Sequence, residues 1–133
     1  MSNFVYNGGK QALLEGQINW LTDDIRAILL DTALYTPSKA HATLSDVPPA
    51  ARVAVSGTLT GRTSTGGAAG SSGAAWTGLP SVSCEAVAIV KVTGVDSTSI
   101  LICHLDTALG LPVSPSTGGN GSVTWTNDQI FAL

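Results

Sequence analysis

Charged residues are scarce in this chain of 133 residues. Six Lys and Arg and nine Asp and Glu make up 11% of it, and the net charge is −3. Nucleic-acid binding needs clustered Lys and Arg to neutralise phosphates, and a polybasic membrane patch needs them too. The six cations are scattered, so we expect neither nucleic acid nor a membrane as a partner. At 44% hydrophobic residues, the chain is also too apolar for a disordered protein.

Long hydrophobic runs and cysteines are also few. No segment reaches the roughly 18 consecutive apolar residues of a membrane-spanning helix, and no basic segment followed by an apolar one marks a secretory signal. Cys84 and Cys103 both lie in apolar, strand-like runs. We expect free buried thiols, although a bridge between the two cysteines stays open if their strands are neighbours.

Candidate catalytic groups are equally rare, because the chain has only two histidines. His41 lies in a Pro-flanked loop and His104 in a strand, where we expect it to be half-buried. Cys103 and His104 are unsuited to act as a dyad, since neighbours on a strand point to opposite faces. No spacing of His, Cys or carboxylates matches a metal site, and Asp23 and Asp24 fit a solvated turn. The sequence therefore predicts neither an enzyme nor a cofactor.

Small residues are abundant instead: 15 Gly, 14 Ser and 15 Thr make about a third of the chain. Short apolar segments separated by turn residues predict a single, mainly β domain over residues 1–133, a sandwich or barrel with one short N-terminal helix. The helix is expected over about 10–17 and a Gly/Ala/Ser-rich loop or arm over 62–78. The expected strands lie at 25–30, 52–59, 86–93, 99–105, 122–126 and 130–133. Aromatic residues make up 5% of the chain, and the three tryptophans among them are expected to be core or interface anchors.

One five-residue segment occurs twice. Leu-Asp-Thr-Ala-Leu is found at 30–34 and again at 105–109, each time after an apolar strand and three residues before a proline. Asp and Thr side chains hydrogen-bond to nearby backbone N–H groups and so end strands in tight turns. We interpret both copies as strand-exit turns; a duplicated half-domain or a shared contact surface is the alternative.

The order of residues along most of the chain resembles a group of small virion proteins of tailed bacteriophages. The resemblance covers the chain except 63–78, and no single piece of it is diagnostic. The stretches that carry it are Tyr6-Asn7 with Lys10, Leu14 and Gly16, Leu21 to Arg26, Leu30 to Ala33, Tyr35 to Pro37, His41, Leu44 to Pro48, Ala51 to Ala54, Leu59 to Gly61, Glu85 to Val90, Leu105 to Ala108, Leu111 to Val113, Val123 to Trp125 and Ile130-Phe131.

Members of that group resemble capsid decoration, or cement, proteins with a jelly-roll-like fold. The resemblance implies a structural protein on the capsid surface of the virion, assembled in the host cytoplasm, bound to the major capsid protein as a homo-dimer or homo-trimer. A tail or fibre component and a host-surface glycan-binding β-sandwich are the alternatives. We hypothesise that residues 1–10 and the Gly/Ala-rich tract around 66–73 form arms that order on the shell. The expected interface residues are Phe4, Tyr6, Gly66, Gly67, Gly70, Gly73 and Trp76.

Overall fold

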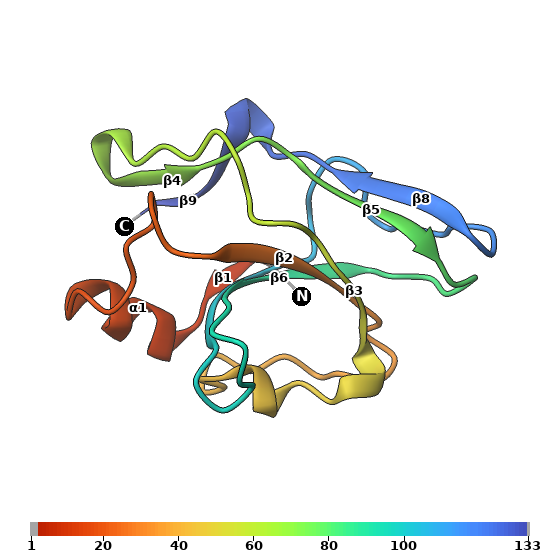
Figure 1. The fold of residues 1–133 in the computed structure, drawn as a ribbon, viewed down its shortest axis with the longest axis horizontal. Helices are drawn as coiled ribbons and strands as arrows, with labels where there is room; N and C mark the ends of the chain where they lie inside the picture. Colours follow the sequence, from red (N-terminus) through yellow and green to blue (C-terminus); the bar gives the residue numbers. More distant parts are fainter. Residues whose placement is uncertain (1–2, 133) are drawn as a thin grey trace.

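The chain folds into a mainly β structure with one α-helix, as the alternation of apolar and turn segments predicts. The computed structural model describes residues 3–132. Figure 1 shows the arrangement of the elements. In chain order these are β1 (Phe4–Val5), α1 (Asn7–Leu14), β2 (Ile25–Leu30), β3 (Arg52–Val55), β4 (Ala68–Gly70), β5 (Ala74–Leu79), β6 (Ala86–Lys91), β7 (Ile100–Leu105), β8 (Gly119–Val123) and β9 (Gln129–Ala132).

Five strands form the central sheet, in the order β1-β7-β6-β2-β3, and its neighbours are antiparallel. The strands expected at 86–93 and 99–105 are confirmed as β6 and β7, which pair with each other, and the strand expected at 25–30 is confirmed as β2. Two further antiparallel ribbons, β4-β9 and β5-β8, are each made of two strands. Each ribbon joins segments far apart in sequence, which is why local patterns did not reveal these pairs.

The two faces of the sheet are covered differently (Figure 1). The ribbons lie over one face and enclose what we call the ribbon-side core, which includes Trp20, Trp76 and Trp125. The irregular segment 31–51 lies over the other face and encloses the loop-side core, which includes Tyr6, Tyr35 and Val47. Alternate residues of β2 supply the two cores, Leu29 the first and Leu30 the second.

The helix begins three residues earlier than expected and ends at Leu14. Asn7, Gly8 and Gly9, which lie before the expected helix, form the first helical turn of α1. Glycine is required there because α1 lies directly on β7: a Cβ on Gly9 would come within 2.7 Å of the Leu101 carbonyl oxygen. Residues 4 and 5 pair with β7 as strand β1. The expectation of an N-terminal arm is therefore wrong for residues 4–10, and residues 1–2 lie outside the described part.

The tract at 62–78 is not a loop or arm. It forms a short turn (Thr65–Gly67), all of β4 and most of β5. The small residues allow close approach of backbones rather than freedom of movement, since a Cβ on Gly73 would come within 2.7 Å of the Val123 carbonyl oxygen. The indole N–H of Trp20 donates to the Gly70 carbonyl oxygen (3.1 Å), and that of Trp125 donates to the Ser72 carbonyl oxygen (3.2 Å). Two tryptophans from outside the tract thus hold it in place.

Three strand ends also differ from the sequence-based expectation. β3 ends at Val55 rather than at residue 59. β8 covers Gly119–Val123 rather than the expected 122–126. β9 covers Gln129–Ala132. Ser56 follows β3 and stays buried while its hydroxyl accepts the N–H of Ala27 (3.0 Å). A side chain therefore takes over a ladder hydrogen bond where the strand is expected to continue.

Candidate functional site

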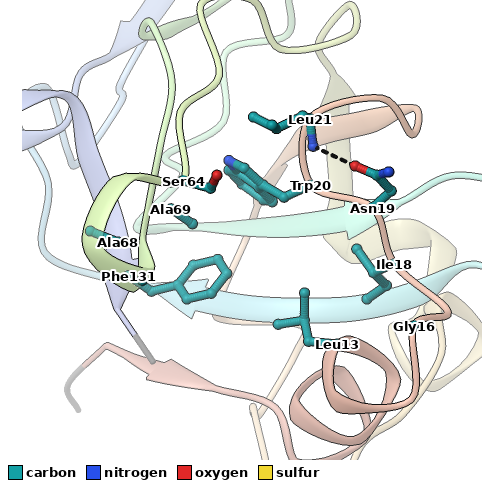
Figure 2. A pocket seen from close by; sticks show the side chains of 11 residues that line it. Leu13, Gly16, Ile18, Asn19, Trp20, Leu21, Ser64, Ala68, Ala69 and Phe131 are labelled. Carbon is teal, nitrogen blue, oxygen red and sulfur yellow. Dashed lines mark hydrogen bonds between the residues drawn. The ribbon is translucent and has the colours of Figure 1, made fainter.

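An apolar hollow of about 370 Å³ lies between the end of α1 and the β4-β9 ribbon (Figure 2). Leu13, Ile18, Trp20 and Phe131 point toward one another in it. The rings of Trp20 and Phe131 meet edge to face, with centroids 5.4 Å apart. The tract contributes Ser64, Gly67, Ala68 and Ala69, whose small side chains leave the space unfilled.

An exposed leucine lies at this hollow. Leu21, which lines it, is 49% exposed. Large apolar side chains at a surface hollow are typical of a contact with another protein. The hollow has the chemistry to receive an apolar side chain.

A second hollow, of about 380 Å³, is polar. We call it the acidic hollow; it is lined by Thr32, Tyr35, Thr36, Pro37, Glu85, His104 and Asp106. The sheet register explains why these residues meet. Leu30 pairs with Ala86 and Leu105 with Val87, so the end of β2, the start of β6 and the end of β7 coincide at one end of the sheet.

The carboxylate of Glu85 closes the β2 side of the acidic hollow. Its Oε1 accepts hydrogen bonds from the backbone N–H of Thr32 (3.2 Å) and from the Thr32 hydroxyl (2.9 Å). Asp106 lies on the β7 side, where its Oδ1 accepts a hydrogen bond from the Thr107 hydroxyl (3.2 Å). Two half-buried carboxylates therefore face one small space.

His104 also borders this hollow and is more deeply buried than expected, at 1% exposed. Its ring stacks on Phe4, with centroids 5.3 Å apart. Neither ring nitrogen has a hydrogen-bond partner in the part of the chain that the structure describes. Burial lowers the pKa of His104, and the negative charge of Asp106 opposes this to a smaller extent. The imidazole is therefore uncharged at neutral pH.

A chain of hydroxyl groups lies next to His104. The hydroxyl oxygens of Tyr6 and Tyr35 are 2.9 Å apart, and the Tyr35 hydroxyl lies 2.8 Å from Nδ1 of His41. Burial raises the pKa of both tyrosines, so both phenols are neutral and their hydrogen bonds are directed at each other and at His41.

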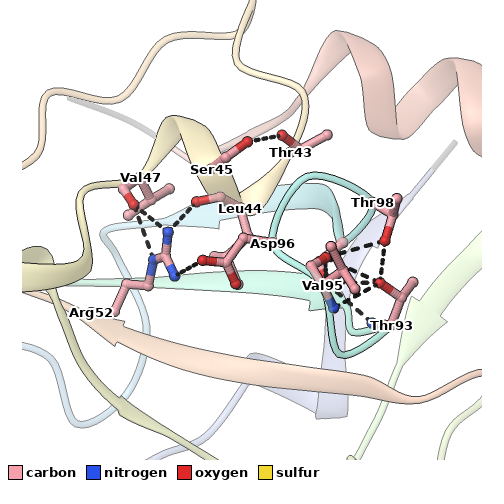
Figure 3. Close-up of polar contacts among 10 residues, drawn as sticks. Thr43, Leu44, Ser45, Val47, Arg52, Thr93, Val95, Asp96 and Thr98 are labelled. Carbon is pink, nitrogen blue, oxygen red and sulfur yellow. Dashed lines mark hydrogen bonds and ion pairs between the residues drawn. The ribbon is translucent and has the colours of Figure 1, made fainter.

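A third polar group, centred on Arg52, holds segment 31–51 against the sheet (Figure 3). The Arg52 guanidinium donates to the carbonyl oxygens of Leu44 (2.6 Å) and Val47 (2.6 and 3.0 Å), and it pairs with the Asp96 carboxylate at 2.8 Å. The Arg52 side chain is 13% exposed, whereas that of Asp96 is 54% exposed. The donors of this arginine are thus used inside the chain, so the group is structural.

Metal and thiol chemistry find little support in the described residues. Within residues 3–132, no three His, Cys, Asp or Glu side chains are grouped so that they could hold a metal ion. Cys84 and Cys103 are both free and buried, as expected. Burial raises the pKa of the Cys84 thiol to about 11 and also raises that of Cys103. Over the same residues, no helix is long and apolar enough to cross a membrane.

The expected interface residues do not form one surface. Tyr6 and Trp76 are buried in the two cores, so placing them at an interface is wrong for the folded chain. Tyr6 is held by Tyr35, and the indole N–H of Trp76 donates to the Ala27 carbonyl oxygen (3.2 Å). Gly70 is buried under Trp20, and Phe4 is half-buried against His104. Of the set, Gly66, Gly67 and Gly73 are exposed, and Gly67 lines the apolar hollow.

Sequence reasoning missed the acidic hollow, although one signal pointed to it. The two copies of Leu-Asp-Thr-Ala-Leu end β2 and β7, which confirms them as strand exits. The first copy contributes Thr32 to the hollow and the second contributes Asp106. Glu85 and Tyr35 gave no comparable signal, because they reach the hollow through the sheet register and through segment 31–51.

Comparison with known proteins gives no assignment. No protein-family model matches the chain, and no curated protein matches it in sequence. The resemblance to virion proteins therefore depends on residue order alone, and the two hollows are the features from which a function can be inferred.

Proposed function

We propose that this chain is a non-catalytic structural protein of a bacteriophage virion, which binds the outside of the capsid and stabilises contacts between capsomers. The observation that carries the proposal is the apolar hollow, which the exposed Leu21 lines. The occupant we propose for it is an apolar side chain of the major capsid protein. Residue order along the chain, which resembles that of cement proteins, supports the same function.

The composition of the surface fits this role. The exposed residues of the turn at 65–67 are Thr and Gly, and Ser64 and Ala68 flank it. Uncharged small residues let two surfaces approach closely with little loss of solvation, whereas burying an unpaired charge is costly. Many such contacts, repeated over a shell, add up to firm attachment through high effective concentration.

We include in the proposal that the two β layers are a variant of the jelly-roll sandwich. The antiparallel pairing of segments distant in sequence, β1 with β7, β4 with β9 and β5 with β8, supports this. A homo-dimer or homo-trimer on the shell is the assembly we expect.

The decisive experiment adds purified protein to undecorated capsids of its phage. We expect co-sedimentation with the capsids and a higher temperature of capsid rupture. Leu21→Gln should weaken binding, because it places an amide at the apolar hollow. Leu109→Gln is the matched control: Leu109 is 60% exposed but does not line this hollow, so it should bind as the wild type does.

Three results would overturn the proposal. Absence of capsid binding together with saturable binding to a glycan would indicate a host-surface receptor function. Antibody labelling of the tail rather than the head would indicate a tail or fibre component. Equal binding by Leu21→Gln and Leu109→Gln would show that the apolar hollow does not contact the capsid.

A further inference from the structure

The acidic hollow combines a buried imidazole that lacks hydrogen bonds with two carboxylates. His104 is 1% exposed, and neither of its ring nitrogens has a partner in the described residues. Buried polar groups are nearly always hydrogen-bonded, and each exception calls for an explanation such as a missing ligand. Because His104 borders a hollow of about 380 Å³, a ligand in that hollow is the explanation closest at hand.

The charge of the lining selects the kind of ligand. Glu85 and Asp106 are the two ionisable carboxyl groups of the lining, and it contains no Lys or Arg among residues 3–132. The Tyr35 hydroxyl is already within hydrogen-bond distance of Tyr6 and His41. Both oxygens of a carboxylate accept hydrogen bonds, and Glu85 uses only Oε1 in the contacts with Thr32. The hollow therefore offers acceptors and negative charge to a ligand that donates hydrogen bonds and is positively charged.

We propose that the acidic hollow binds an ammonium or guanidinium group carried on a short carbon chain. In this arrangement Oε2 of Glu85, which the contacts with Thr32 leave unused, accepts a hydrogen bond from the cationic group, while the Tyr35 ring and Pro37 contact the carbon chain. Ligand pockets usually measure about 300–1,000 Å³, so a hollow of about 380 Å³ has room for such a group and its carbon chain.

His104 contributes an uncharged acceptor beneath the two carboxylates. A neutral imidazole has one nitrogen that accepts and one that donates, so it does not repel a cation. Both nitrogens are covered in the unliganded chain. Contact with the ligand therefore includes a small turn of the His104 ring, which changes the NMR signals of the imidazole.

The first test titrates the ¹⁵N-labelled wild-type chain with n-butylammonium and, separately, with n-butylguanidinium. We expect saturable shifts of the Thr32 and Glu85 amides and of the His104 ring nitrogens. n-Butanol, which has the same carbon chain and no charge, should produce at least tenfold weaker effects. Equal responses to the alcohol and to the cations, or no saturable shift at any of these positions, would overturn the proposal.

The second test removes one charge from the hollow. Glu85→Gln keeps a side-chain oxygen for the contacts with Thr32, and we expect it to weaken cation binding about tenfold, the effect of one charge-assisted hydrogen bond. Glu15→Gln is the matched control, since Glu15 is an exposed glutamate at the end of α1. Equal affinities of the two variants would contradict the proposal. If Glu85→Gln does not fold, Asp106→Asn makes the same test on the β7 side.

The cationic group has two sources, a free amine or the side chain of a Lys or Arg on another protein. Lysine and arginine blocked at both ends distinguish them. Binding of the blocked amino acids as strong as that of n-butylammonium assigns the hollow to a side chain, and their exclusion assigns it to a free amine. These measurements need no capsid, so their outcome is independent of whether the chain binds one.

Discussion

The two faces of the central sheet are closed in different ways, and the difference explains the two hollows. On the ribbon side, other strands cover the sheet, and the indole N–H groups of all three tryptophans donate to oxygens inside the chain. On the loop side, segment 31–51 covers the sheet and is held by Arg52 and by the hydrogen bonds of Tyr6, Tyr35 and His41. The hollow at the edge of the first core is apolar, and that at the edge of the second is polar.

A cover built from strands satisfies its own backbone groups and can present apolar side chains. A cover built from an irregular segment lacks a strand ladder, so side chains satisfy part of its backbone, as Arg52 does for the carbonyl oxygens of Leu44 and Val47. The chemistry of each hollow thus follows from the kind of structure that closes the face. Substitutions on the two sides should therefore differ in size and in their dependence on pH.

The largest effect is expected on the ribbon side, for Trp76→Ala. Trp76 is 3% exposed and joins β5 to the sheet through its ring and its hydrogen bond to Ala27. Removing a buried aromatic side chain typically costs about 3–5 kcal/mol of unfolding free energy. Denaturant unfolding would measure it, with the exposed Thr77→Ala as the control. A loss below about 1 kcal/mol would mean that the ribbons are not fastened to the sheet through this residue.

A smaller effect is expected on the loop side, for Arg52→Met. This substitution removes the guanidinium donors from the carbonyl oxygens of Leu44 and Val47, of which Leu44 keeps the Val47 N–H (3.0 Å), and we expect a loss of about 2 kcal/mol. Asp96→Asn removes only the exposed ion pair and should cost about 0.5 kcal/mol or less. Equal losses for the two variants would show that the ion pair, rather than the carbonyl contacts, holds segment 31–51.

The smallest effect is expected for His104 and should appear only in acid. Burial lowers the pKa of His104 in the folded chain, so as the pH falls below about 6.5 the unfolded chain takes up the proton first. The stability of the wild type then decreases by at most about 1.4 kcal/mol per pH unit. His104→Leu should remove this contribution while changing stability little at pH 7.5.

Urea unfolding at several pH values would measure the difference between the wild type and His104→Leu. Parallel pH profiles for the two proteins would contradict the assignment of an uncharged, buried imidazole at position 104.

Local pattern predicted the elements whose residues face a core on both sides. β2, β6 and β7 were expected nearly at their observed bounds, since each is a short apolar run between turn residues. The buried thiols were also expected. The positions of α1 and of the strands in the Gly/Ala/Ser tract were not, because Gly9 and Gly73 look like turn residues when only their neighbours in sequence are considered.

The candidate sites were largely beyond the reach of sequence. Phe131 and Leu13 meet in the apolar hollow across more than a hundred residues of chain, and no local signal relates them. For the acidic hollow, the repeated Leu-Asp-Thr-Ala-Leu segment indicated two strand exits, but the sheet register brought them together with Glu85.

The sequence by itself determined that this is a mainly β chain with little charge and few groups for catalysis, because composition and the alternation of apolar residues act locally. The tertiary structure alone decided which glycines allow backbones to touch, that Tyr6 and Trp76 are buried, and where the two hollows lie. The physical reason is that strand pairing and the closure of each sheet face join residues far apart in the chain, and their proximity is decided by packing rather than by neighbours in sequence.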